Sequence, residues 1–277
     1  MLVFLRQFYG EYHQIMVLES WLILASGGLV SGILAGFLGI GGGVILVPLL
    51  ITLGYTPVQA VATSSLGILI NSVFGSYQNW KMGYLNFKPI IYLGLPAVAT
   101  AQIGVYLASR IPPFLLLFLF GVLLIFNIYL VQLRNRLLVK QASTNAKPAK
   151  PFNPLFARIL TGGAAGILAG LFGVGGGVIM VPLQMLLLGE KIKVAIQTSL
   201  AVIVVTAVAA CIGHAVAGNV LFIQGIILGS GGLLGVQVST RTLPKLPDRL
   251  VSLIFRVFLA GLSVYFFWEA WQSFQTI

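Results

Sequence analysis

The chain has 277 residues, of which 58% are hydrophobic and 8% are charged, and its mean hydropathy is +1.04. Because charged residues make up about a quarter of an ordinary soluble domain, this composition excludes a soluble enzyme. No charged residue occurs from Ser20 to Trp80, from Ile159 to Gly189 or from Val194 to Thr240. One membrane-spanning helix needs only about 20 apolar residues, so the longest of these stretches contain several membrane elements. We therefore expect an all-α polytopic integral membrane protein.

The predicted elements begin with residues 1–19, which do not form the continuous apolar stretch of a cleavable signal. We expect this segment to lie at the membrane interface as a short helix, because one helical face carries Leu5, Phe8, Tyr12 and Ile15. Residues 20–133 form a first membrane unit, with helical elements predicted near 20–38, 44–54, 57–79, 89–109 and 113–133. Residues 134–157, which contain KPAKPFNP, are predicted to be a solvated linker. A second unit covers 158–277.

The two units are copies of each other. Residues 32–49 read GILAGFLGIGGGVILVPL, and residues 166–183 read GILAGLFGVGGGVIMVPL. Further identities follow at a slightly larger offset and include the Thr-Ser pairs at 63–64 and 198–199. The sequence thus predicts two tandem repeats of about five helical elements each.

The positions of the basic residues predict the orientation of these repeats. Lysine and arginine gather in the linker and in the loops near 81–88, 191–193 and 241–249, which places those segments in the cytoplasm. The formal charge of +11 is thereby explained without a nucleic-acid partner. This topology leaves both termini outside the cytoplasm and makes the repeats inverted. The element after each glycine triplet has only about half the length of a span, so eight spans with two re-entrant hairpins and ten elements both remain open.

The glycine triplets are the first candidate site: Gly41, Gly42, Gly43, Gly175, Gly176 and Gly177. They interrupt helical patterns, and the helices that follow would direct their unpaired N–H groups and positive dipole ends toward the triplets. Inverted copies would bring the two broken helices together near the membrane midplane, where transporters built from repeats bind their substrates. The alternative is that these glycines serve close helix packing only. We favour an anion-binding site.

Several polar side chains recur at matching positions in the two copies. The hydroxyls of Thr63, Ser64, Thr198 and Ser199 could donate hydrogen bonds to a substrate oxyanion or to the carbonyl one turn earlier in their own helix. The amides of Gln102 and Gln237 could contact substrate or bridge helices. We include all six in the predicted substrate site.

Other polar positions lack an identical partner in the other copy. His214 aligns with Asn79 and is either a buried structural group or a proton relay. Asn71 also stands without a match. Arg256 either extends its guanidinium to the cytoplasmic face or balances a substrate charge.

The missing residue types narrow the function. The predicted spans contain no aspartate or glutamate apart from Glu269 near the end of the last one, which disfavours a cation substrate. No Walker loop, GxSxG elbow, HExxH motif or cysteine cluster occurs, so we expect neither an enzyme, a metal site nor a cofactor.

The doubled glycine motif, each copy followed by A-x-x-T-S at 60–64 and 195–199, resembles the TauE/SafE sulfite exporter family, also called TSUP. The resemblance covers about residues 27–267. It implies a multi-pass transporter of the plasma or inner membrane that moves small anions, chiefly sulfite and organosulfonates, without ATP.

We therefore predict a secondary transporter of a small anion, sulfite or an organosulfonate, that works by alternating access. Its partners would be this anion and the lipid bilayer, and a homodimer is left open. The alternatives are a carrier of small organic carboxylates and a membrane assembly protein that transports nothing.

Overall fold

The computed structural model describes residues 2–144 and 153–275, with side chains described for 20–133 and 153–275. Over these ranges it contains α-helices and one short 3-10 helix, and no strand. The chain is therefore an all-α protein. The helices, in chain order, are α1 (Leu2–Leu38), α2 (Gly43–Thr52), α3 (Pro57–Lys81), α4 (Phe87–Ala108), α5 (Pro113–Thr144), α6 (Pro154–Phe172), α7 (Gly177–Leu187), α8 (Ile192–Val216), α9 (Phe222–Thr242), η1 (Leu243–Lys245) and α10 (Asp248–Gln275).

Helix lengths distinguish the two span counts that the sequence left open. Among the described residues, 8 helices are long and apolar enough to cross a membrane, which makes the chain a polytopic membrane protein. Helices α2 and α7 have 10 and 11 residues. At 1.5 Å per residue each extends about 15 Å, half of the ~30 Å hydrocarbon core. Both follow a glycine turn and run back along the preceding helix, so the architecture is eight long helices with two short hairpin helices.

Local sequence signals explain where the helices begin. Thr56 caps α3 in a capping box with Gln59, and Pro57 follows at the first helical position. Asn153 caps α6 in the same place relative to Pro154. Two predicted boundaries differ from the structure. Helix α5 continues to residue 144 rather than ending at 133, because no glycine or proline interrupts residues 122–144. Helix α1 runs without a break through the boundary predicted at 19–20.

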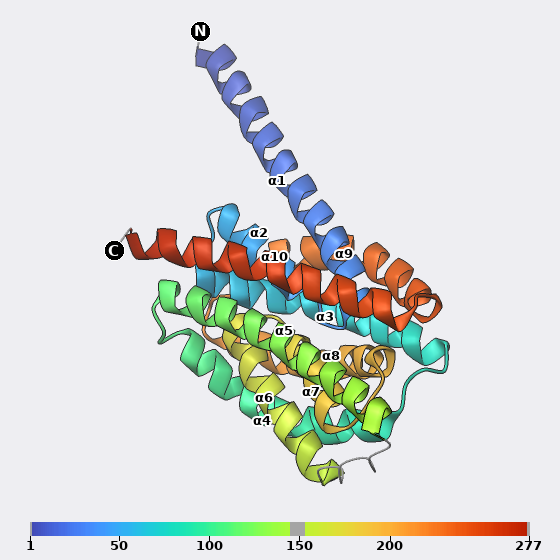
Figure 1. The fold of residues 1–277 in the computed structure, drawn as a ribbon. Helices are drawn as coiled ribbons and strands as arrows, with labels where there is room; N and C mark the ends of the chain where they lie inside the picture. Colours follow the sequence, from blue (N-terminus) through green and yellow to red (C-terminus); the bar gives the residue numbers. More distant parts are fainter. Residues whose placement is uncertain (1, 145–152, 276–277) are drawn as a thin grey trace.

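The helices of the two copies exchange neighbours (Figure 1). Helix α1 packs against α9 of the second copy, and its counterpart α6 packs against α4 of the first. Helices α3 and α8 contact each other in the interior, while α5 and α10 lie side by side. The N-terminal part of α1 extends away from the other helices. Whether the copies are inverted relative to a membrane stays a prediction.

Rows of glycines bring the exchanged helices close together. A side chain added at any of these glycines would overlap the backbone or a side chain of the neighbouring helix, so only glycine permits the approach. The contacts also show that each pair of helices runs parallel. In the α1–α9 pair, Gly28, Gly32 and Gly36 meet Leu228, Gly232 and Ser239; in the α6–α4 pair, Gly162, Gly166 and Gly170 meet Leu93, Ala97 and Ala101.

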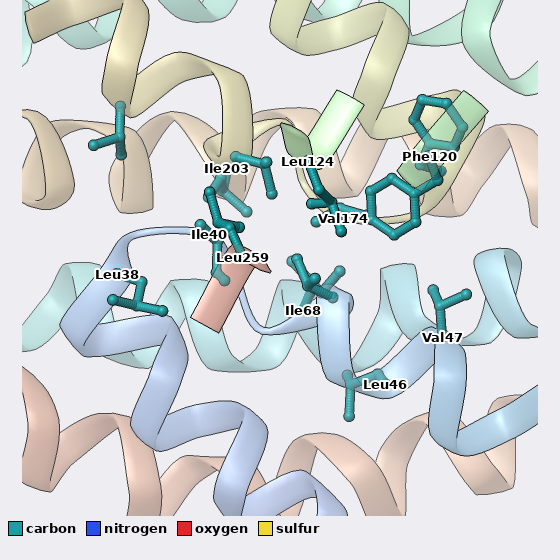
Figure 2. Close-up of a cluster of buried hydrophobic side chains, with 14 of the residues drawn as sticks. Leu38, Ile40, Leu46, Val47, Ile68, Phe120, Leu124, Val174, Ile203 and Leu259 are labelled. Atoms are coloured by element: carbon teal, nitrogen blue, oxygen red, sulfur yellow. The ribbon is translucent and has the colours of Figure 1, made fainter. Parts of the chain in front are cut away.

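The hydrophobic core lies where the two copies meet. Figure 2 shows Ile40 and Val174, which follow the ends of α1 and α6, beside Ile68 of α3 and Ile203 of α8. All four are at most 2% exposed. On one side of this core the ring of Phe120 stacks on Phe172 and meets Phe266 edge to face. The core therefore joins both copies rather than filling each one separately.

Candidate functional site at the crossing of the glycine breaks

Each glycine triplet forms a tight left-handed turn. Gly41 and Gly42 have φ angles of 75° and 85°, and Gly175 and Gly176 have 75° and 77°. Residues with a Cβ rarely adopt this conformation, so glycine is required at these positions. The next glycine in each triplet, Gly43 or Gly177, is already the first residue of the short helix. The turn thus stops one long helix and starts a short one within the protein interior.

The two glycine turns, at 41–43 and 175–177, are named here the glycine breaks, and the place where they meet is named the crossing. The two breaks touch each other. A Cβ at Gly43 would overlap the carbonyl oxygen of Gly173, and a Cβ at Gly177 would overlap the carbonyl oxygen of Gly39. The structure therefore brings all six predicted glycines to one place. Helices α2 and α7 both begin there, so their positive dipole ends converge on the crossing. The first N–H groups of a helix have no partner within that helix and can bind an anion.

Serine hydroxyls tie each break to the opposite copy. The hydroxyl of Ser64 on α3 donates to the carbonyl oxygen of Gly173 at 2.9 Å, and that of Ser199 on α8 donates to Gly39 at 2.7 Å. Each hydroxyl also lies 2.9 Å from a carbonyl oxygen of the preceding turn, at Val61 or Ile196. Both serines are fully buried. Their hydroxyls hold the backbone of the breaks in place.

Two further hydroxyls satisfy carbonyls in the turns. Ser31 of α1 donates to Gly42 at 3.0 Å, and Thr206 of α8 donates to Gly175 at 3.1 Å. The turn carbonyls are therefore covered by hydroxyl donors, while the helix N-termini contribute N–H groups.

Two isoleucines stand between the breaks, and sequence reasoning did not select them. A Cβ at Gly41 would lie 2.7 Å from a methyl group of Ile68 and 3.3 Å from one of Ile203, and a Cβ at Gly175 would meet the same two side chains. The two positions are equivalent in the repeat, so extending the alignment through α3 and α8 would have identified them. Their side chains fill the space next to both turns.

The remaining matched polar residues have no hydrogen bond to the glycine turns among those found in the described residues. Thr63 is buried and accepts a hydrogen bond from the backbone N–H of Leu221, which precedes α9, at 3.1 Å. Gln102 of α4 is exposed, and its amide donates to the carbonyl of Ala209 on α8 at 2.7 Å. This contact bridges two helices. Thr198 is buried beside Ser199, and Gln237 is half-buried on α9.

The two candidate charge partners occupy different environments. His214 is 1% exposed on α8, and its Nε2 lies 3.0 Å from the carbonyl oxygen of Gly170 on α6. This contact ties α8 to α6 close to the second break. Arg256 is half-buried on α10, where its Nε donates to the carbonyl of Ser252 in its own helix at 3.3 Å. His214 thus contacts the residues just before the second glycine break, whereas Arg256 bonds only within α10.

Comparison with known proteins agrees with this architecture. The profile of the sulfite exporter TauE/SafE family matches residues 24–266, which include both breaks and every helix of the crossing. The chain belongs to the TauE/SafE family. The two glycine triplets, which are part of the motif that carried the resemblance, meet in the fold.

The similarity to curated relatives extends over almost their full length. The chain is 30% identical to the probable membrane transporter protein YdhB of Bacillus subtilis over 240 residues, which are 85% of this chain and 96% of that protein. It is 25% identical to the probable membrane transporter protein YunE of the same organism, with 90% and 98% covered. A probable membrane transporter protein of Methanocaldococcus jannaschii shares 27% identity, with 85% and 91% covered. The family and the names of these relatives indicate that the chain is a membrane transporter.

Proposed function

We infer that this TauE/SafE protein is a secondary transporter that carries a small oxyanion, sulfite or an organosulfonate, across the cell membrane by alternating access. The observation that supports this proposal most directly is the crossing of the two glycine breaks, where two helix N-termini converge within the membrane protein. Such an arrangement stabilises negative charge in a medium of low dielectric constant. The choice of a sulfur oxyanion follows from the family description.

The sequence of the helices around the crossing supports an anionic cargo. Helices α2, α3, α4 and α6 to α9 contain no aspartate or glutamate. Cation pathways in membranes depend on carboxylates, and their absence from these sequences disfavours a cation. The proposed site uses backbone N–H groups and hydroxyls instead.

The exchange of helices between the copies supports alternating access. Helices α1, α3 and α9 form one bundle, and α4, α6 and α8 form its counterpart. The two bundles meet at α3 and α8, and each contributes one glycine break to the crossing. A rocking motion of one bundle against the other would expose the same site first to one side of the membrane and then to the other.

Counterflow in proteoliposomes tests the function. Liposomes loaded with unlabelled anion and diluted into labelled anion should accumulate label transiently above equilibrium, because a carrier exchanges its substrate. Sulfite, thiosulfate, sulfoacetate, sulfate and acetate are compared, with protein-free liposomes as the control. Preference for acetate would establish the carboxylate carrier, and the absence of accumulation for all five anions would favour the assembly protein.

A matched pair of double variants tests the crossing itself. Gly42→Ala/Gly176→Ala places side chains in both turns, where they would overlap Ser31 and Ala165. Gly54→Ala/Gly189→Ala imposes similar left-handed strain at φ angles of 89° and 68°, with nothing within 4 Å. Only the first pair should abolish counterflow. Normal flux in the folded Gly42/Gly176 variant would remove the crossing from the transport site.

A further inference from the structure

A row of four polar side chains follows the crossing along α3: Asn71, Ser72, Ser76 and Asn79, named here the α3 polar row. Asn71 and Ser72 are fully buried, and Asn79 and Ser76 are 1% and 9% exposed. Six of their side-chain atoms are buried without any hydrogen-bond partner among the described residues: both amide atoms of Asn71 and Asn79 and the hydroxyl oxygens of Ser72 and Ser76. Buried polar groups nearly always have partners, so this concentration requires an explanation.

The row begins beside the crossing. Its residues recur at helical spacing after Ile68, whose side chain lies beside the two turns. They therefore continue the same face of α3. Asn71 lies one turn beyond Ile68, and its amide lies against the backbone of Gly232 on α9. Ser72, Ser76 and Asn79 then lead along α3 toward its C-terminal end at Lys81.

The equivalent positions on α8 of the second copy can be compared with the α3 polar row. The equivalents of the α3 polar row are Thr206, Ala207, Cys211 and His214. There, the polar groups of Thr206 and His214 contact the carbonyls of Gly175 and Gly170, and the other two side chains are an alanine and a cysteine. The α8 side chains at these positions are therefore hydrogen-bonded or weakly polar. The matching α3 side chains have donors and acceptors without partners among the described residues. Because the two rows occupy equivalent positions of the repeat, helix packing alone does not account for this difference.

The chemistry of the row suits a small oxyanion. Two amides and two hydroxyls supply N–H and O–H donors without a formal charge, so they can bind an anion and still release it. The amide oxygens can accept a hydrogen bond from a hydroxyl group on a monoprotonated oxyanion. Polar side chains that only join membrane helices show interhelical bonds, as Gln102 does with Ala209.

Basic residues mark the end of the row. Helices α3 and α9 run parallel, because successive glycines of α9 at 225, 229 and 232 lie against Leu66, Ile70 and Asn71. Their C-terminal ends therefore lie at the same end of the bundle, where Lys81 and Arg241 are exposed. Two positive charges at this end attract anions toward the row.

We propose that the α3 polar row binds the transported oxyanion between the crossing and the Lys81 end of α3, and that it is the substrate site of one access state. This inference rests on the proposed transport function. It assigns a binding role to Asn71, Ser72, Ser76 and Asn79, and none to Ala207 and Cys211, the α8 equivalents of the two serines.

The test is Ser72→Ala/Ser76→Ala, with labelled sulfite as the probe. Loss of two hydroxyl donors should raise the half-saturating sulfite concentration in counterflow about tenfold, which corresponds to ~1.4 kcal/mol. The unfolding midpoint in detergent should stay level or rise, because the variant removes unpartnered buried hydroxyls. A structural role would instead lower that midpoint and leave half-saturation unchanged.

Controls separate this proposal from the transport function. Cys211→Ala truncates the α8 equivalent of Ser76 and should leave half-saturation unchanged. Asn79→Leu should weaken sulfite binding independently of the serines, as measured by equilibrium binding to purified protein. If the unaltered protein transports sulfite but both α3 variants keep its half-saturation and affinity, the α3 site is refuted and transport stands. If the unaltered protein moves none of the five anions, both proposals fail.

Discussion

Replacing Gly176 by alanine should destabilise this transporter more than replacing Gly189, although both glycines have positive φ. Gly176 precedes α7 with φ 77°, and Gly189 follows it with φ 68°. A left-handed alanine costs about 1–2 kcal/mol, and this penalty applies to both variants. At Gly176 the new methyl group would also lie 2.9 Å from the carbonyl carbon of Ala165 and closer still to its oxygen, whereas at Gly189 nothing lies within 4 Å.

The overlap sets the expected difference. Forcing a methyl group into a packed interior costs about 1–3 kcal/mol, so Gly176→Ala should lose about 2–5 kcal/mol in total and Gly189→Ala about 1–2 kcal/mol. Cys211 is the only cysteine and is 8% exposed, so a thiol-reactive dye reports unfolding in detergent. Equal unfolding midpoints for the two variants would refute the assignment of Gly176 to a sterically closed turn.

Three other perturbations address the hydroxyl contacts, the core and the topology. Ser199→Ala leaves the buried carbonyl of Gly39 without its hydroxyl donor and should lower the free energy of unfolding by about 1–3 kcal/mol. Ser230→Ala removes an exposed hydroxyl and should lower it less. Equal losses would contradict the role of Ser199. Ile68→Ala should cost about 2–5 kcal/mol by the same dye assay, and a loss below about 1 kcal/mol would place that side chain outside the packed core. A cysteine at Lys147 in a Cys211→Ala background should react with an impermeant maleimide only after cell lysis, and labelling of intact cells would reverse the predicted topology.

Much of the fold follows from local sequence. Long uncharged stretches, the repeated glycine motif and the capping residues at Thr56 and Asn153 are signals within a few residues of the boundaries they determine. The predicted elements accordingly match the helices closely, and the half-length elements after the glycines are the two short helices α2 and α7. The main boundary error, at the end of α5, arises because hydropathy marks the end of the lipid-compatible stretch and not the end of the helix.

The pairing of polar groups could not be predicted from sequence. Ser64 donates to a carbonyl 109 positions away and Ser199 to one 160 positions away. Nothing in helical periodicity specifies such partners, so a hydroxyl that bonds to substrate and one that bonds to backbone have the same local sequence. Gln102 illustrates the same limit, because its place in an apolar helix does not indicate that its amide bonds to the backbone of α8. The α3 polar row required the structure, which shows that, among the described residues, Asn71 and Asn79 lack the partners that their α8 equivalents Thr206 and His214 have.

The exchange of hydroxyls between the copies has a consequence for biosynthesis. The carbonyl of Gly39 in the first hairpin depends on Ser199, which the ribosome adds 160 residues later. Until α8 is inserted, the first glycine turn lacks this donor, and α1 lacks its neighbour α9. The N-terminal half therefore enters the membrane as an incomplete structure. Its final packing is a late, post-insertion event, and severing the chain between residues 145 and 152 should yield two fragments that regain activity only when they are produced together.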